Sequence, residues 1–189
     1  MNPTNPHLQN VVTQLCDTLT KAAIPHAMIG AMALGFYGIP RYTADIDLIS
    51  DARHIESLLS SMQNLGYHCY HQTDFFAQFE ALDPKAGQVD FLLMQTAEGR
   101  AMLSDSVIIQ DEMLGRIPVV QPTDYAILKL MAMANNRDRR MHDGADLSTL
   151  IKADAAGLIH HAFTPLNLER IRQFAQRFGM TQLLSPLLP

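Results

Sequence analysis

The sequence contains no tryptophan, only two cysteines and few aromatic residues. Cys16 and Cys69 fit no metal-binding spacing, so we expect free thiols in a reducing compartment rather than a disulfide-stabilised domain. No segment approaches the roughly 20 apolar residues that a membrane-spanning helix needs. The first ten residues are polar and contain proline, which is unlike a signal peptide. These absences lead us to expect a cytoplasmic protein that does not contact the membrane.

Positive charge is also scarce, because 14 Lys and Arg residues stand against 19 Asp and Glu residues, for a formal net charge of −5. General affinity for nucleic-acid backbones needs a basic surface, so this class of protein is disfavoured, although a local basic patch stays open. The 189 residues, 48% of them hydrophobic, are enough for a sizeable core. We expect a core region over residues 1–121 and a helical region over residues 122–189 packed on it.

The most informative stretch runs from residue 27 to residue 50. Its pattern predicts an apolar strand, a turn at Gly30, a short helix over residues 31–37 and a second strand that carries Asp45 and Asp47. Side chains two apart on a strand share a face, so the two carboxylates are expected to project together. Adjacent carboxylates repel unless a cation lies between them. Mg²⁺ is such a cation, and it pairs one or two carboxylates with substrate phosphates.

Each part of this pattern also has a simpler interpretation. Two acids at a strand end are more often solvated than metal-bound, and a glycine after a strand usually marks a turn. The order of the parts favours function, because a strand–Gly–helix unit places free backbone N–H groups where a phosphate binds. That unit precedes the two acids, with Arg41 and Thr43 on the segment between. Together these features predict a nucleotide site.

A third carboxylate, Asp90, lies inside the apolar segment over residues 88–94, which follows a strong turn signal. Burying an unpaired carboxylate costs several kcal/mol. One interpretation is that Asp90 lies at a strand end or pairs with an arginine. The other is that its strand lies beside the strand of Asp45 and Asp47 and completes a three-carboxylate cluster. The residues alone leave both interpretations open.

The C-terminal part is expected to be helical. Thr123 is predicted to cap a helix over residues 124–134, in which Lys129 stands among apolar residues. A charged run follows, comprising Arg137, Arg139, Arg140, Asp143 and Asp146. It can be a solvated helix start or a clamp for phosphates. His142 is more simply a surface or packing histidine than a catalytic base.

Taken together, these motifs resemble the nucleotidyltransferase superfamily with the DNA polymerase β-like fold. The resemblance is closest to its small bacterial members, namely abortive-infection toxins, minimal nucleotidyltransferases and antibiotic nucleotidyltransferases. It rests on the pattern hydrophobic-Gly-Ala-x-Ala from Ile29, then Gly38, Arg41, Thr43 and Asp45-Ile46-Asp47-Leu48, and a later Asp90. Lys129, Asp143 and Asp146 also match the family pattern. The sequence departs from it at Ala31, often Ser or Gly, and at His142, where relatives carry Lys.

The resemblance implies an α+β (mixed α/β) fold with a small mixed sheet flanked by helices, and a C-terminal helical part. It implies an enzyme that uses Mg²⁺ (or Mn²⁺) to transfer NMP from an NTP such as ATP to a hydroxyl acceptor. The residues that it assigns to metal binding and catalysis are Asp45, Asp47 and Asp90, with Asp90 also receiving the acceptor proton. The residues that it assigns to the nucleotide are Gly30, Ala31, Arg41, Thr43 and Lys129.

The sequence leaves the acceptor open among a tRNA end, a protein hydroxyl and a small molecule, and it does not select the NTP. A toxin with an antitoxin partner and a homodimer formed through the apolar tail also stay open. One alternative is a non-catalytic member of the superfamily that acts as a binding or regulatory partner. Another is a glycosyltransferase that uses the two acids and Mg²⁺. Such an enzyme usually needs a longer nucleotide-binding domain than the 45 or so residues before this motif allow.

Overall fold

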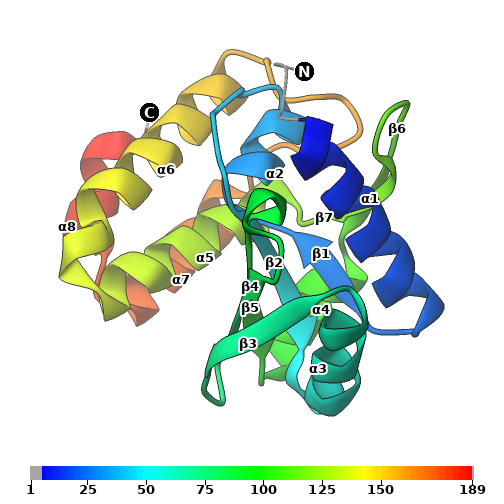
Figure 1. Cartoon of the computed structure of the whole chain (residues 1–189). Helices are drawn as coiled ribbons and strands as arrows, with labels where there is room; N and C mark the ends of the chain where they lie inside the picture. The colour runs from blue at the N-terminus through cyan, green and yellow to red at the C-terminus, as the bar shows by residue number, and fades with distance from the viewer. Residues whose placement is uncertain (1–5, 189) are drawn as a thin grey trace. The chain divides into compact units, whose positions relative to one another are not determined.

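The computed structural model describes residues 6–188, which form two compact units (Figure 1). The first comprises residues 6–36 and 40–120, and the second comprises residues 37–39 and 121–188. The helices of the first unit are α1 (Pro6–Lys21), α2 (Gly30–Tyr37), α3 (Ile55–Asn64) and α4 (Ala97–Ser104). Its strands are β1 (His26–Met28), β2 (Ile46–Asp51), β3 (Tyr67–Gln72), β4 (Phe76–Ala81), β5 (Gln88–Met94), β6 (Val107–Asp111) and β7 (Gly115–Val119).

The strands of the first unit form one mixed sheet in the order β3-β4-β5-β2-β1-β7-β6. Strand β2 pairs with β5 in parallel, β1 pairs with β7 in parallel, and the other neighbours are antiparallel. Central strands are apolar on both sides, and Ile46, Leu48 and Ile49 of β2 are fully buried. The expected mixed sheet flanked by helices is confirmed.

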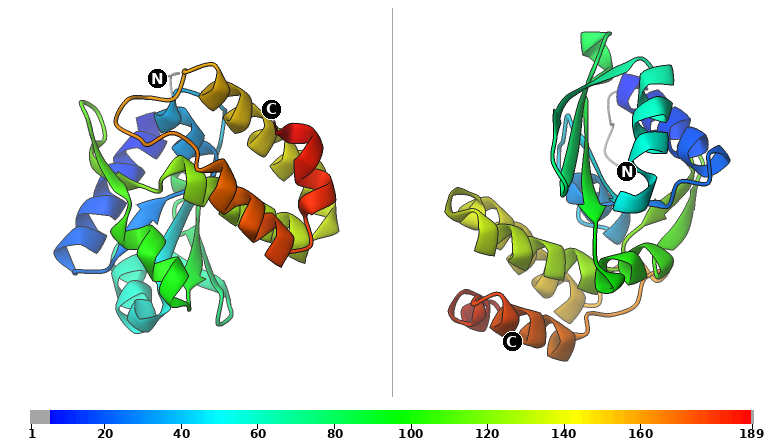
Figure 2. Two further views of the ribbon diagram at one scale, coloured as in Figure 1. Left: turned by 180° about the vertical axis from the view of Figure 1, so that it is seen from behind. Right: turned by 90° about the horizontal axis from the view of Figure 1, so that it is seen from below.

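Helices α1 and α3 cover one face of this sheet, as the right-hand view of Figure 2 shows. Both are amphipathic, which explains their position: Leu15 and Leu19 of α1 and Leu58 and Met62 of α3 are buried. No helix within residues 6–188 is long and apolar enough to cross a membrane.

The second unit is helical, with α5 (Pro122–Asn135), α6 (Arg140–Ala155), α7 (Leu168–Arg177) and α8 (Thr181–Leu184). Residues 37–39 belong to it because the Tyr37 ring packs edge-to-face on Tyr125 and Phe163, with ring centroids 5.8 and 4.8 Å away. Arg170 of α7 lies 2.7 Å from the buried carboxylate of Asp124 on α5, which ties these two helices together.

The N-terminal cap predicted for α5 is wrong. The helix begins at Pro122, and Gln121 occupies the cap position without a side-chain hydrogen bond to the helix. The Thr123 hydroxyl instead accepts a hydrogen bond from the Asn167 backbone N–H at 2.9 Å. Proline has no N–H to satisfy at the first helical position, so the helix can begin one residue before the threonine.

Candidate active site

Asp47 and Asp90 lie directly opposite each other on the parallel strands β2 and β5. Residues that are partners in a parallel pair project from the same face, and neighbouring strands are about 4.8 Å apart. Both side chains are half-buried. Two carboxylates this close repel each other, which makes the pair a natural binding site for a cation. The sequence analysis expected these two strands to be neighbours, and the structure also gives the register.

Gln78, which the sequence analysis did not identify, fixes the orientation of Asp90. It lies opposite Asp90 on the antiparallel neighbour β4, and its Nε2 donates a hydrogen bond to Asp90 Oδ2 at 2.9 Å. This bond stabilises one rotamer of the carboxylate and neutralises none of its charge. No pattern in a single sequence identifies the residue that pairs with a given residue across a sheet.

Gly30 allows the first turn of α2 to lie against Asp47. The Ile29 backbone N–H donates to the Asp47 carbonyl oxygen at 2.9 Å, and α2 begins at the next residue. Gly30 has φ +64°, in the left-handed region that favours glycine. A Cβ atom at this position would clash with Asp47 Oδ2 and would lie 2.8 Å from Asp47 Cγ. The close approach places the partly positive helix N-terminus beside the carboxylate.

We therefore predict that Gly30→Ala lowers the free energy of unfolding by about 2–4 kcal/mol, from the left-handed backbone and the clash together. Gly35→Ala, in the same helix, is the matched control. Nothing lies within 4 Å of a Cβ atom at residue 35, so the better helix propensity of alanine should raise stability by about 0.5–1 kcal/mol. Chemical denaturation measures both variants. Equal effects at the two positions would contradict the close packing of Gly30 on Asp47.

Asp45 lies in a bend one residue before β2, so the expectation that it is part of this strand is wrong. Its side chain is exposed. The Thr43 hydroxyl accepts a hydrogen bond from the Asp45 N–H at 3.2 Å and donates one to the Asp45 carbonyl oxygen at 3.0 Å. Thr43 thus shapes the loop that leads into Asp45. Arg41 is exposed on the same loop, and Ala31 is half-buried in the first turn of α2.

Tyr70, on β3, lies within electrostatic reach of the same acids. Desolvation of part of its ring raises the pKa of its phenol, and the negative charges of Asp90, Glu80 and Asp45 raise it further. The ring is 43% exposed. At neutral pH the phenol therefore stays protonated. The sequence analysis did not identify Tyr70, because a β-bulge between Cys69 and His71 sets the register of β3.

The carboxylates do not form a complete metal cage. Within residues 6–188 no group of three or more His, Cys, Asp or Glu residues is placed to hold a metal ion. Asp47 and Asp90 are paired, and Asp45 precedes their strand. This arrangement suits Mg²⁺, which is commonly bound by one or two carboxylates and completes its coordination with substrate phosphates.

In the second unit, Lys129 of α5 is bound by two carboxylates of α6. Its Nζ lies 2.7 Å from Asp143 Oδ1 and 2.8 Å from Asp146 Oδ2. The ammonium also lies 5.4 Å from the centre of the Tyr125 ring, and the Tyr125 hydroxyl donates to Asp146 at 3.5 Å. Arg139 lies 3.5 Å from Asp143. Lys129 therefore joins α5 to α6 in this unit.

The remaining residues of the charged run have separate positions. Arg140 donates from Nε to the Met133 carbonyl oxygen at 3.0 Å, which fixes the start of α6 on α5. Arg137 is exposed in the short 3₁₀ turn before α6, and His142 is exposed on α6. Of the two simpler interpretations of His142, a surface position and a packing position, its exposure agrees with the first.

Comparison with solved structures shows that this chain has the nucleotidyltransferase fold. The antibiotic-resistance factor ANT(2'')-Ia superposes with a TM-score of 0.63 at 11% identity, over 94% of each chain. The lincosamide antibiotic adenylyltransferase LnuA, solved with lincomycin, gives 0.53 at 14% identity over 75% of this chain and 94% of its own. An antigenic nucleotidyltransferase-like protein from Paracoccidioides brasiliensis gives 0.55 at 15% identity over 96% and 91%. The sequence matches no protein-family model and no curated protein.

Proposed function

We propose that this protein is a Mg²⁺-dependent nucleotidyltransferase that transfers NMP from an NTP to a hydroxyl group. The observation that carries the proposal is the Asp47–Asp90 pair beside the Gly30 turn. A carboxylate pair needs a cation, and a helix N-terminus next to it offers backbone N–H groups to phosphates. The fold shared with nucleotidyltransferases supports this combination of donor and metal.

In the proposed reaction, the acceptor oxygen forms a bond to the α-phosphorus of the NTP. The bond from that phosphorus to the bridging oxygen breaks, and pyrophosphate leaves. Asp90 receives the acceptor proton, with Gln78 holding its carboxylate in place. Bound Mg²⁺ or Mn²⁺ would supply charge stabilisation for the attacking and leaving oxygens. Asp47 and Asp90 would hold the metal, with Asp45 as a third proposed ligand.

The donor phosphates are assigned to the start of α2. The backbone N–H groups of Gly30 and Ala31 would bind the β- and γ-phosphates, because the first N–H groups of a helix have no partner within it. Arg41 and Thr43 lie on the loop between α2 and Asp45, and they are proposed to contribute to the nucleotide site. Lys129 is proposed to neutralise phosphate charge, in addition to its two ion pairs.

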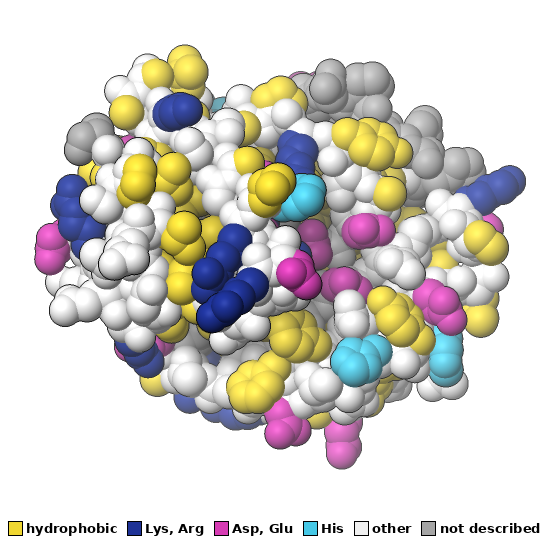
Figure 3. Space-filling model, turned by 90° about the vertical axis from the view of Figure 1, so that its left-hand side faces the viewer, with side chains coloured by type: hydrophobic (Ala, Val, Ile, Leu, Met, Phe, Trp, Pro, Cys, Tyr) yellow, Lys and Arg dark blue, Asp and Glu magenta, His cyan; other side chains and the backbone are white. Residues whose placement is uncertain are grey.

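A small-molecule hydroxyl is the acceptor that we favour. ANT(2'')-Ia has been solved in complex with adenylyl-2''-tobramycin, an adenylylated small molecule, and LnuA has been solved with lincomycin. The face drawn in Figure 3 carries acidic, basic and hydrophobic side chains, without a continuous basic surface over its described residues. Together with the net charge of −5, this disfavours a long RNA acceptor.

Thermal melting with each of the four NTPs, with and without Mg²⁺ or Mn²⁺, tests the proposal. A ligand at 100 times its Kd should stabilise the protein by about 2.7 kcal/mol, which raises Tm by about 5–10 °C for a chain of this size. We expect a metal-dependent rise with at least one NTP, ATP being the first to try. No metal-dependent rise with any NTP would contradict the proposal and favour the non-catalytic alternative.

A further inference from the structure

A second polar cluster lies at the other end of β2. Asp47 and Asp51 lie on the same face of this strand, four residues or about 13 Å apart. Asp51 is 2% exposed and binds Arg53, whose Nε lies 2.9 Å from Asp51 Oδ2. The guanidinium holds the pKa of the Asp51 carboxyl below its usual range. This pair uses Nε and Nη2 of Arg53 and leaves the Nη1 group out of the ion pair.

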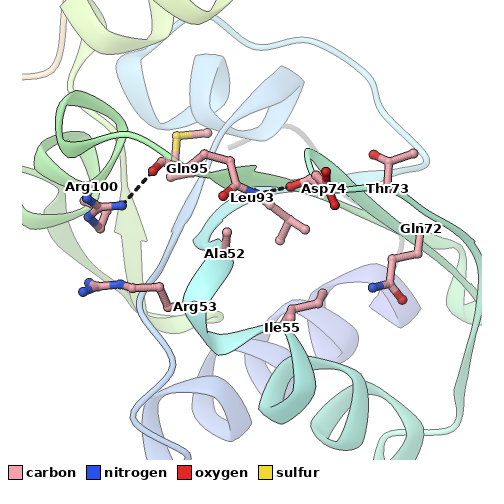
Figure 4. A pocket seen from close by; sticks show the side chains of 10 residues that line it. Ala52, Arg53, Ile55, Gln72, Thr73, Asp74, Leu93, Gln95 and Arg100 are labelled. Atoms are coloured by element: carbon pink, nitrogen blue, oxygen red, sulfur yellow. Dashed lines mark hydrogen bonds between the residues drawn. The ribbon is translucent and has the colours of Figure 1, made fainter.

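Arg100, on α4, lines the same cavity as Arg53. Figure 4 shows Arg53 and Arg100 extending to the same side of a cavity, away from Gln72 and Thr73. Arg100 donates from Nη1 to the Gln95 carbonyl oxygen at 2.9 Å, which leaves its Nε and Nη2 groups outside that bond. Both arginines also line a second, larger cavity of about 520 Å³.

The lining of the larger cavity combines two arginines with mostly apolar groups. Of the described residues that line it, Asp51 is the only acid, so with Arg53 and Arg100 the lining carries one net positive charge. Apolar groups make up most of the rest: Ala23, Ile24, Pro25, Leu103, Ile108 and Pro118. Ile108 is 54% exposed and so leaves apolar surface uncovered at this cavity. A volume of this size fits a small organic molecule.

His26 also lines this cavity. It is 7% exposed, and its Nδ1 lies 2.8 Å from the Ile24 carbonyl oxygen, which can only accept, so Nδ1 carries the proton. Burial lowers the pKa of its imidazole, so the ring is neutral and Nε2 is an acceptor. Nε2 is buried and makes no hydrogen bond within residues 6–188. His26 Nε2 can only accept a hydrogen bond, so it offers nothing to an anion and serves here as a neutral reporter of the cavity wall.

We infer that this cavity binds a small organic anion with its carboxylate or phosphate at Arg53 and Arg100 and its apolar body along Ile24, Leu103 and Ile108. Guanidinium groups suit such anions, because their N–H donors match the geometry of two oxygen atoms. The site is separate from the Asp47–Asp90 pair, so it is distinct from the site of the proposed reaction. The inference does not depend on the protein being a nucleotidyltransferase.

The test is NMR titration of the full-length protein with hexanoate, phenyl phosphate, inorganic phosphate and the neutral hexanamide. Saturable shifts of the His26 and Ile108 signals are expected with the two organic anions, with Kd of about 1 mM, a usual affinity for molecules of this size. Hexanamide and inorganic phosphate should each bind about tenfold more weakly, because each lacks one half of the ligand. No saturable shift with either organic anion up to about 10 mM, or equal binding of hexanamide, would overturn the inference.

Two variants locate the binding and one controls for charge. Arg100→Gln should weaken hexanoate binding about tenfold by removing a charged donor. Thr20→Phe should do the same by filling the cavity from α1, with no change in charge. Arg116→Gln makes the same charge change at an exposed site on β7 outside the cavity and should leave Kd unchanged. Binding that survives both Arg100→Gln and Thr20→Phe would place the ligand elsewhere and overturn the inference.

Discussion

Asp47→Asn is expected to lower the rate of NMP transfer by about 10³-fold and to abolish the metal-dependent rise in Tm with NTP. Asn keeps the shape of the side chain but removes the charge that would hold the cation opposite Asp90. The free protein should be no less stable than the wild type, because one of two facing negative charges is gone. The measurements are pyrophosphate release from the NTP that stabilises the wild type, and melting of both proteins.

Asp17→Asn is the matched control for this prediction, because it makes the same charge change on the exposed face of α1 in the same unit. It should leave both readouts unchanged. Asp90→Asn should reproduce the loss, since Asp90 is the other half of the pair. NMP transfer by Asp47→Asn at the wild-type rate would contradict the assignment of Asp47 as a metal ligand. If the free Asp47→Asn protein loses stability as well as activity, the variant acts through folding.

The order of motifs in the sequence allowed much of the site to be predicted. Strand β5 was expected over residues 88–94 and has these bounds, because an apolar run between a turn and a polar segment is a strong signal. Strand β2 was expected from the apolar residues Ile46, Leu48 and Ile49 on either side of Asp47. Parallel pairing of β2 with β5 then places Asp47 beside Asp90. This step came from the family resemblance, since pattern alone does not choose strand neighbours.

The parts that could not be predicted depend on register and on contacts between distant residues. Gln78 reaches Asp90 only because of how β4 and β5 align, and Tyr70 lies at a bulge in β3 that no sequence pattern announces. Asp45 falls outside β2 because a hydrogen-bonded turn with Thr43 precedes the strand. Asp45 and Asp47 are two residues apart whether both lie in the strand or one lies in the turn before it. Local periodicity therefore cannot show where the strand begins.

The sequence and the structure indicate different roles for Lys129. The family resemblance assigned Lys129 to the nucleotide, whereas the structure shows two ion pairs inside the helical unit. The side chains of Asp143 and Asp146 are only 3% and 8% exposed. Buried carboxylates need a cation, so they account for a lysine on α5 without any ligand. Both roles use the same ammonium group, and a substitution at Lys129 alone cannot distinguish them.

Lys129→Met is therefore predicted to lower the free energy of unfolding of the helical unit by about 3–5 kcal/mol, because it leaves two buried carboxylates without their shared cation. Chemical denaturation followed through the helical signal measures this loss. Lys152→Met, at an exposed position on α6, is the control and should change stability by less than about 0.5 kcal/mol. A loss at Lys129 as small as at Lys152 would contradict the structural role.

Adding Asp143→Asn and Asp146→Asn to Lys129→Met should restore most of the lost stability, since neutral groups replace the whole cluster. The NTP affinity of this triple variant then separates the two roles. If the triple variant regains both stability and wild-type NTP affinity, the role of Lys129 is only to join α5 to α6. Affinity that stays about tenfold lower in a stable protein would support the phosphate contact, because the loss of one charged hydrogen bond has about that effect. Removing both carboxylates therefore allows the ligand-binding role of Lys129 to be measured apart from its structural role.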